Sequence, residues 1–235
     1  MRQHILSGNQ EQLTFKRGSE ITPVWIDAER GIVYASDSPG SLPHLFRRDL
    51  ATRTDEQLLA PRFHQLVGDV FPNGRSVAYA ERESREFKLF QLPLIRGASP
   101  TPLLPGRRGS SMRFSPDGRA MAYVDAGRAQ MYVALVEGTS EPVLAVSNFS
   151  GPLAWSPDSR EINYVSRDDA MMTMAVHMRP PSLKVDVPTQ LFNFRRPASL
   201  LEVSSDGRFL LFVPHVRAGE RPIVVDTAAI SSTQR

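Results

Sequence analysis

Hydrophobic and polar positions alternate in five similar segments along the chain. Each segment opens on an apolar residue, passes through a polar turn to an arginine, and continues with alternating aliphatic and aromatic positions. In the third copy Phe114 opens the segment, residues 115–118 form the turn, and Met121 and Tyr123 follow Arg119. Period-two alternation is typical of a strand with one buried face, and Pro, Asp and Gly favour a tight turn. Each copy therefore predicts a β-hairpin.

The five copies recur at steps of 45, 44, 41 and 48 residues. They open at Trp25, Val70, Phe114, Trp155 and Val203. A third apolar strand pattern follows every hairpin, and a fourth follows the first four. Four antiparallel strands in a repeat of this length are typical of one blade of a β-propeller.

The repeats predict an all-β fold with five four-stranded blades in a single domain over residues 1–235. The blades are expected at about residues 16–60, 61–106, 107–147, 148–194 and 195–228. The fifth repeat ends at its third strand, and residues 11–15 are expected to supply the missing strand and close the ring. Alternatively, the chain is the C-terminal part of a propeller with six or more blades.

Composition restricts the remaining possibilities. The chain has no Cys, which excludes disulfides and thiolate metal sites. No apolar run is long enough to span a bilayer, so no membrane segment is expected. The net charge is +3 without a continuous basic tract, and nucleic acid is not an expected partner. We expect a monomer. Its compartment is open: cytoplasmic as written, or periplasmic if it belongs to a longer, membrane-anchored protein.

Catalytic motifs are absent from the sequence. It contains no Gly-x-Ser-x-Gly elbow and no His-Glu-x-x-His pair. The turn aspartates recur once per blade, and carboxylates that act as acid and base must instead flank one substrate. We therefore expect the aspartates Asp117, Asp158 and Asp206 and the repeated arginine to be structural. No catalytic residue, metal or cofactor is predicted.

The loops that surround the mouth of the predicted channel are the candidate binding site, because binding residues commonly lie on loops of a rigid scaffold. Guanidinium groups there would suit a carboxylate, a phosphate or an acidic peptide. The candidate residues are His64, Arg107, Arg108, Arg195 and Arg196.

The Phe-Ser-Pro-Asp-Gly-Arg core with its following apolar-Ala-Tyr strand resembles the TolB-type propeller repeat, over about residues 11–226. The tail from Glu202 to Val225 resembles the closing blade of propellers attached to bacterial membrane Ser/Thr protein kinases and winged-helix regulators. The resemblance implies a non-catalytic protein- or ligand-binding module that serves as a signalling sensor. The alternative is an accessory propeller of a hydrolase or a polysaccharide lyase.

Overall fold

Strands are the only regular elements in the part of the chain that the computed structural model describes. That part comprises residues 2–3, 10–11, 13–14, 19–26, 30–37, 41–59, 62–137, 140–193, 200–203, 209–214 and 223–228. The chain divides into two compact units, Met1–Met112 and Arg113–Arg235. The all-β prediction is confirmed.

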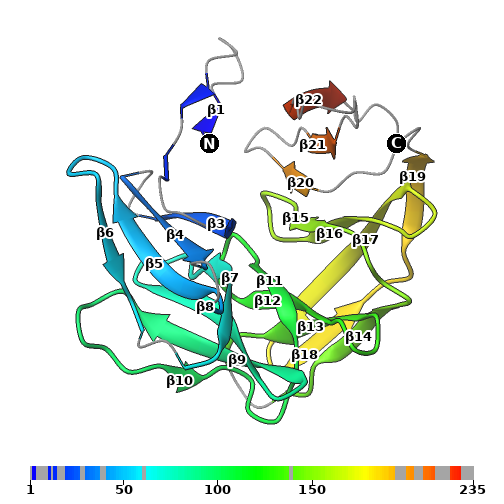
Figure 1. Ribbon diagram of the computed structural model, residues 1–235. Helices are drawn as coiled ribbons and strands as arrows, with labels where there is room; N and C mark the ends of the chain where they lie inside the picture. Colours follow the sequence, from blue (N-terminus) through cyan, green and yellow to red (C-terminus); the bar gives the residue numbers. More distant parts are fainter. Residues whose placement is uncertain are drawn as a thin grey trace. The chain divides into compact units, whose positions relative to one another are not determined.

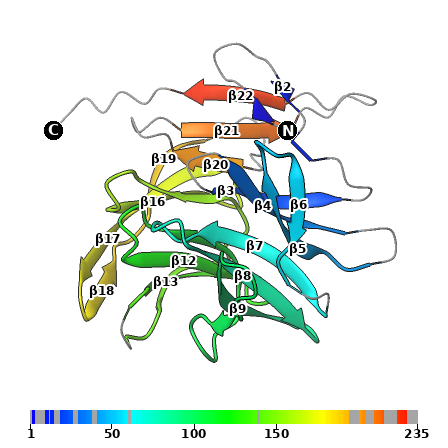
Figure 2. The same cartoon turned by 90° about the vertical axis from the view of Figure 1, so that its left-hand side faces the viewer.

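The first unit holds two four-stranded antiparallel sheets, seen in colours from blue through cyan to green in Figures 1 and 2. The first sheet has the order β3-β4-β5-β6, and the second has the order β10-β9-β8-β7. Their strands are β3 (Glu20–Ile26), β4 (Gly31–Ser36), β5 (His44–Asp49), β6 (Thr54–Gln57), β7 (His64–Val70), β8 (Ser76–Glu83), β9 (Glu86–Pro93) and β10 (Thr101–Pro102). Each sheet is the meander predicted for one blade.

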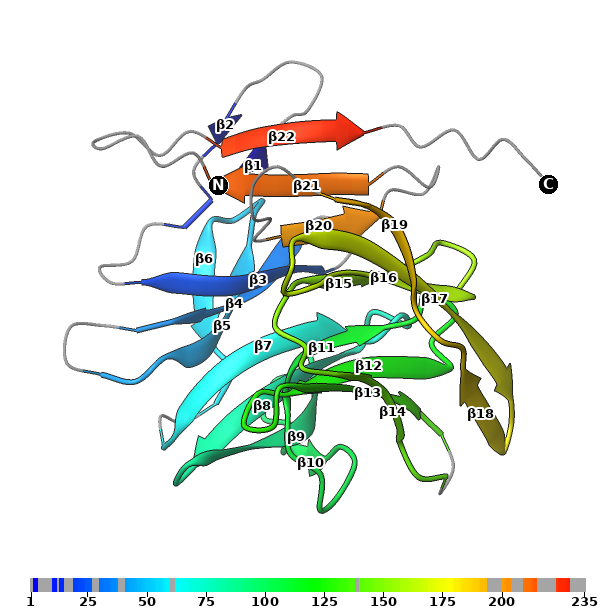
Figure 3. The ribbon, with the colours of Figure 1, turned by 90° about the vertical axis from the view of Figure 1, so that its right-hand side faces the viewer.

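The division between the units falls within β11 (Ser110–Phe114), which begins a third four-stranded sheet, β11-β12-β13-β14. A five-stranded sheet and a three-stranded sheet follow. Figure 3 shows the feature that the repeat did not predict, the hairpin of β17 and β18. These strands are β12 (Ala120–Asp125), β13 (Gln130–Leu135), β14 (Val143–Ser147), β15 (Leu153–Trp155), β16 (Glu161–Val165), β17 (Ala170–Arg179), β18 (Ser182–Val185), β19 (Thr189–Asn193), β20 (Leu200–Val203), β21 (Phe209–Pro214) and β22 (Ile223–Ala228).

The repeated aromatic residue forms the centre of each of the first three sheets. It is fully buried there and stacks on an aromatic ring directly opposite it on the third strand. Facing aromatic pairs stabilise adjacent strands beyond their burial. The pairs, with their centroid separations, are Tyr34–Phe46 (5.9 Å), Tyr79–Phe90 (5.4 Å) and Tyr123–Tyr132 (5.5 Å).

The turn aspartates bond within their own turns. Asp117 Oδ1 accepts hydrogen bonds from the Ser115 hydroxyl at 2.7 Å and the Arg119 amide at 3.1 Å. Asp158 Oδ1 repeats this pattern with the Ser156 hydroxyl at 2.6 Å. These two carboxylates therefore have the expected turn role, and Asp206 lies outside the described residues.

The strand expected at residues 11–15 differs in the structure. Instead, β2 (Gln10–Glu11) pairs with β1 (Arg2–Gln3), and Leu13 and Thr14 lie outside strands. Leu13 is buried against Ile32 and Tyr34 of the first sheet. Its side chain therefore finds an apolar surface in the first unit without joining a ladder. In the described residues the last sheet has three strands, β20, β21 and β22, and closure of a five-bladed ring stays a prediction.

Candidate functional site

His64 is the first residue of β7, where it lies opposite Arg82 of β8. Its ring meets the ring of Phe87 edge to face, with centroids 5.5 Å apart. The guanidinium of Arg82 lies 5.7 Å from the centre of the same phenylalanine ring. The imidazole is half-buried, and its Nε2 atom is inaccessible and makes no hydrogen bond in the described structure. A buried polar atom without a protein partner is costly unless water or a ligand satisfies it, so His64 is a candidate for a ligand contact.

A second histidine lies close to the first. His44 begins β5 of the preceding sheet, and its Nδ1 atom is likewise buried without a hydrogen bond in the described structure. Burial chiefly lowers the pKa of His64, and the charges of Arg82 and then His44 lower it further. His64 is therefore neutral at neutral pH, the form that can take up a proton or coordinate a ligand.

Gln65 holds the two histidine-bearing strands together. Its side chain is almost fully buried, and its oxygen accepts a hydrogen bond from the Leu45 amide at 3.2 Å. Its amide nitrogen donates to Glu81 Oε2 at 2.8 Å, and its backbone N–H donates to the Pro43 carbonyl at 2.9 Å. Through these hydrogen bonds Gln65 links the start of β7, which carries His64, to the start of β5, which carries His44, and to the carboxylate of Glu81.

Of the four arginines predicted to belong to the site, the structure describes Arg107 and Arg108. The Gly109 N–H donates to the Phe87 carbonyl at 3.0 Å, so the segment with Arg107 and Arg108 runs beside the residue that contacts His64. Arg108 forms an ion pair with Glu86, and half of each side chain is exposed. That pairing lowers its availability for an anionic ligand. Arg195 and Arg196 lie outside the described residues.

Sequence reasoning named His64 but missed His44, Gln65 and Arg82. His44 could have been found from its position, because it begins a strand of the first sheet just as His64 begins a strand of the second. Within the described ranges no group of three or more His, Asp or Glu side chains could hold a metal ion.

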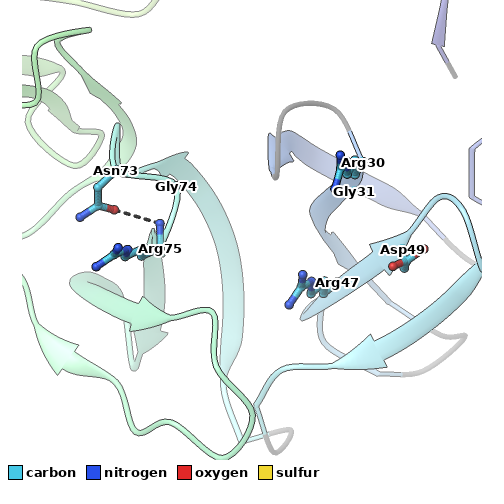
Figure 4. Close-up of a pocket in the computed structure, with 7 residues that line it drawn as sticks. All are labelled: Arg30, Gly31, Arg47, Asp49, Asn73, Gly74 and Arg75. Carbon is cyan, nitrogen blue, oxygen red and sulfur yellow. Dashed lines mark hydrogen bonds between the residues drawn. The ribbon is translucent and has the colours of Figure 1, made fainter.

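A separate cavity of about 680 Å³ lies elsewhere in the first unit. Figure 4 shows that its lining comes from two neighbouring sheets. The lining residues are Arg30, Gly31, Arg47, Asp49, Asn73, Gly74 and Arg75. Three guanidinium groups and one carboxylate give it a formal excess of two positive charges, and it was not predicted.

No protein-family model and no curated protein sequence matches this chain. Solved structures do resemble it. TolB from Acinetobacter baumannii superposes with a TM-score of 0.60 at 15% identity, over 84% of this chain and 50% of that one. This chain thus spans half the TolB chain. The fold class is that of the β-propellers.

Two gluconolactonases share this propeller fold. The protein from Xanthomonas campestris has a TM-score of 0.62 at 15% identity, over 86% of this chain and 72% of that one. The periplasmic gluconolactonase of Pseudomonas aeruginosa has a TM-score of 0.58 at 16% identity, over 99% and 78%.

These neighbours correct the functional prediction. A non-catalytic sensor module was expected, and that prediction is wrong, because propellers named as gluconolactonases share the fold. The TolB-like propeller character is confirmed. The finer resemblance to kinase-attached propellers stays a prediction.

No helix within the described residues is long and apolar enough to cross a membrane.

Proposed function

We propose that this chain is a hydrolase of the lactonase type, in which His64 acts as general base on a cyclic ester. The observation that carries the proposal is the half-buried imidazole of His64, which lies opposite Arg82 and has a pKa lowered chiefly by burial. The lactonase neighbours support the reaction class, and the imidazole supports the residue. A general base works best when its pKa lies near the working pH, where its neutral form is populated and still accepts a proton readily.

The reaction requires one proton transfer and one bond exchange. With its proton on the enclosed Nε2, His64 accepts a proton from water at Nδ1, and the resulting hydroxide attacks the carbonyl carbon of the lactone. The ring C–O bond then breaks, and the departing oxygen takes the proton back from the imidazolium. The product is a hydroxy acid, which ionises to its carboxylate.

Arg82 and Gln65 have supporting roles in this proposal. The guanidinium of Arg82 is close enough to lower the pKa of His64, so it can also stabilise negative charge on the carbonyl oxygen. Gln65 is a positioning residue because its hydrogen bonds fix the start of β7. Its contribution is to hold the imidazole in place before substrate arrives.

The test measures acid release in a pH-stat from a panel of sugar δ-lactones, with the spontaneous rate subtracted. The wild-type chain should hydrolyse at least one of them. The His64→Gln variant should lose about 10²–10⁴-fold in kcat/KM, as expected for removal of a general base. His177→Gln is the matched control, since that histidine is exposed and paired with Asp186 at 2.8 Å.

The pH profile separates catalysis from a structural effect. The kcat/KM of the wild type should rise with pH through a pKa below 6.5, the ordinary value for histidine, and then level off. Absence of lactone opening above the spontaneous rate, or full activity in a folded His64→Gln variant, would refute the proposal.

A further inference from the structure

We infer that the arginine-lined cavity of the first unit is a binding site for a phosphate group, distinct from the proposed lactonase site. It lies between the first two sheets and is lined by Arg30, Arg47 and Arg75 with Asp49 and Asn73 (Figure 4). Its volume of about 680 Å³ is within the range of small-molecule sites.

The first argument comes from the repeat. Arg30, Arg75 and Arg119 occupy the same position of the motif, and all were expected to be structural. Arg119 does bond the Met178 carbonyl at 3.3 Å. Arg30 and Arg75 are exposed and make no ion pair with any residue that the structure describes. The same position therefore supplies a structural bond in one sheet and two available guanidinium groups in the others.

The second argument is the fixed charge of the lining. Arg47 is half-buried on β5, and its Nη1 lies 3.5 Å from the Leu94 carbonyl, which anchors the side chain. Hydrogen bonds from Thr52 lower the pKa of Asp49 the most, and the charge of Arg47 lowers it further. Asp49 is therefore ionised, but its Oδ1 already accepts a hydrogen bond from the Thr52 amide at 2.8 Å. The cavity keeps its excess of two positive charges at neutral pH.

The third argument is access to backbone and amide donors. Gly74 has a φ of 69°, and nothing lies within 4 Å of where a Cβ would be. A ligand can thus approach the main chain there closely, which glycine permits. Asn73 Oδ1 accepts the Arg75 amide at 2.9 Å, which leaves the Asn73 amide nitrogen to donate. This turn presents an arginine, an amide and open backbone together.

Phosphate matches this lining better than a single carboxylate does. A phosphate monoester carries about −1.5 to −2 charges at pH 7 and three acceptor oxygens. Guanidinium groups bind such oxygens in bidentate fashion. The ligand is therefore inorganic phosphate or the phosphate of a small metabolite, and the cavity is large enough for the latter.

The experiment is a calorimetric titration of the whole chain with inorganic phosphate and with glucose 6-phosphate. Both should saturate, and the sugar phosphate should bind more tightly if the rest of the cavity contacts the sugar; equal affinity would assign the site to phosphate alone. Arg30→Gln and Arg75→Gln should each weaken binding by about tenfold or more, since each removes a charge-assisted contact.

Arg160→Gln is the matched control because Arg160 occupies the same motif position in the second unit and is not among the residues that line the cavity. It should leave the affinity unchanged. No saturable binding of either phosphate, or equal weakening by Arg160→Gln, would overturn the inference. Lactone hydrolysis is not used as a readout, so the two proposals fail independently.

Discussion

Removal of Asp55 should destabilise the first sheet strongly. Its carboxylate accepts a hydrogen bond from the Tyr34 hydroxyl at 2.9 Å and pairs with Arg48 Nη1 at 3.0 Å. Only 6% of the Arg48 side chain is exposed, against 22% for Asp55. Burial and the bond to Asp55 raise the pKa of Tyr34, which stays a hydrogen-bond donor at any practical pH. Asp55→Ala therefore leaves a buried cation and a buried hydroxyl without this partner.

The magnitude follows from the burial of the two partners. Breaking a fully buried ion pair costs about 3–5 kcal/mol, and partial exposure of Asp55 reduces the ionic part. The lost hydroxyl bond adds about 1 kcal/mol. We expect a total of about 3 kcal/mol, which lowers the urea midpoint by about 1 M or more. Lys184→Ala removes an ion pair of the same 3.0 Å length with 74% of the lysine exposed, and should cost less than about 1 kcal/mol.

The assay is urea unfolding followed by circular dichroism, performed as a double-mutant cycle. In an Arg48→Met background no cation remains to lose its ion pair with Asp55, so Asp55→Ala should cost only the hydroxyl bond, about 1 kcal/mol. The same cost in both backgrounds would refute the assignment of the effect to the Arg48 charge. A cost for Asp55→Ala no larger than that for Lys184→Ala would refute the argument from burial.

Three further outcomes are expected. Burial lowers the pKa of His64. The contribution of the neutral imidazole to the free energy of unfolding is therefore present above pH 6.5 and is lost as the pH falls through the folded-state pKa. His64→Gln should make the free energy of unfolding depend less steeply on pH, as measured by urea unfolding between pH 4 and 8. Ser115→Ala should cost about 2 kcal/mol in thermal unfolding, since the fully buried hydroxyl donates to Asp117. Gly151→Ala should cost more than Ser115→Ala, since the new Cβ would lie 2.0 Å from the Val165 carbonyl oxygen; equal stability would refute the steric argument.

The sequence predicted the parts of the fold that repeat. A turn that needs Ser115 and Asp117, or a stacked pair such as Tyr34 and Phe46, is specified by residues in one hairpin or in adjacent strands. Such short-range patterns recur once per repeat and can be read directly from their spacing. The hairpin that adds β18 occurs in one sheet alone among those described, so no periodicity could indicate it.

The candidate sites were harder to predict, because their members come from different sheets. His44 and His64 are 20 residues apart, and their proximity depends on strand direction and on the Gln65 bridge between the sheets. Burial then lowers the pKa of His64, and sequence pattern alone does not reveal that degree of burial. The arginine-lined cavity was missed for the opposite reason: Arg30 and Arg75 belong to the repeat, and repeated arginines were expected to be structural.

In both candidate sites, a position of the repeat holds a different residue, or makes a different contact, from the same position in other sheets. The residue that begins the third strand is His44 in the first sheet, but Glu86, Gln130 and Ala170 in the next three. The motif arginine bonds a carbonyl at Arg119 but lines a cavity at Arg30 and Arg75. Strand pairing stabilises every described sheet, and stacked aromatics stabilise the first three, which leaves strand starts and turn arginines free to differ between sheets. Substitutions at His44 should therefore affect His64 chemistry far more than fold stability, whereas substitutions at Tyr34 should do the reverse.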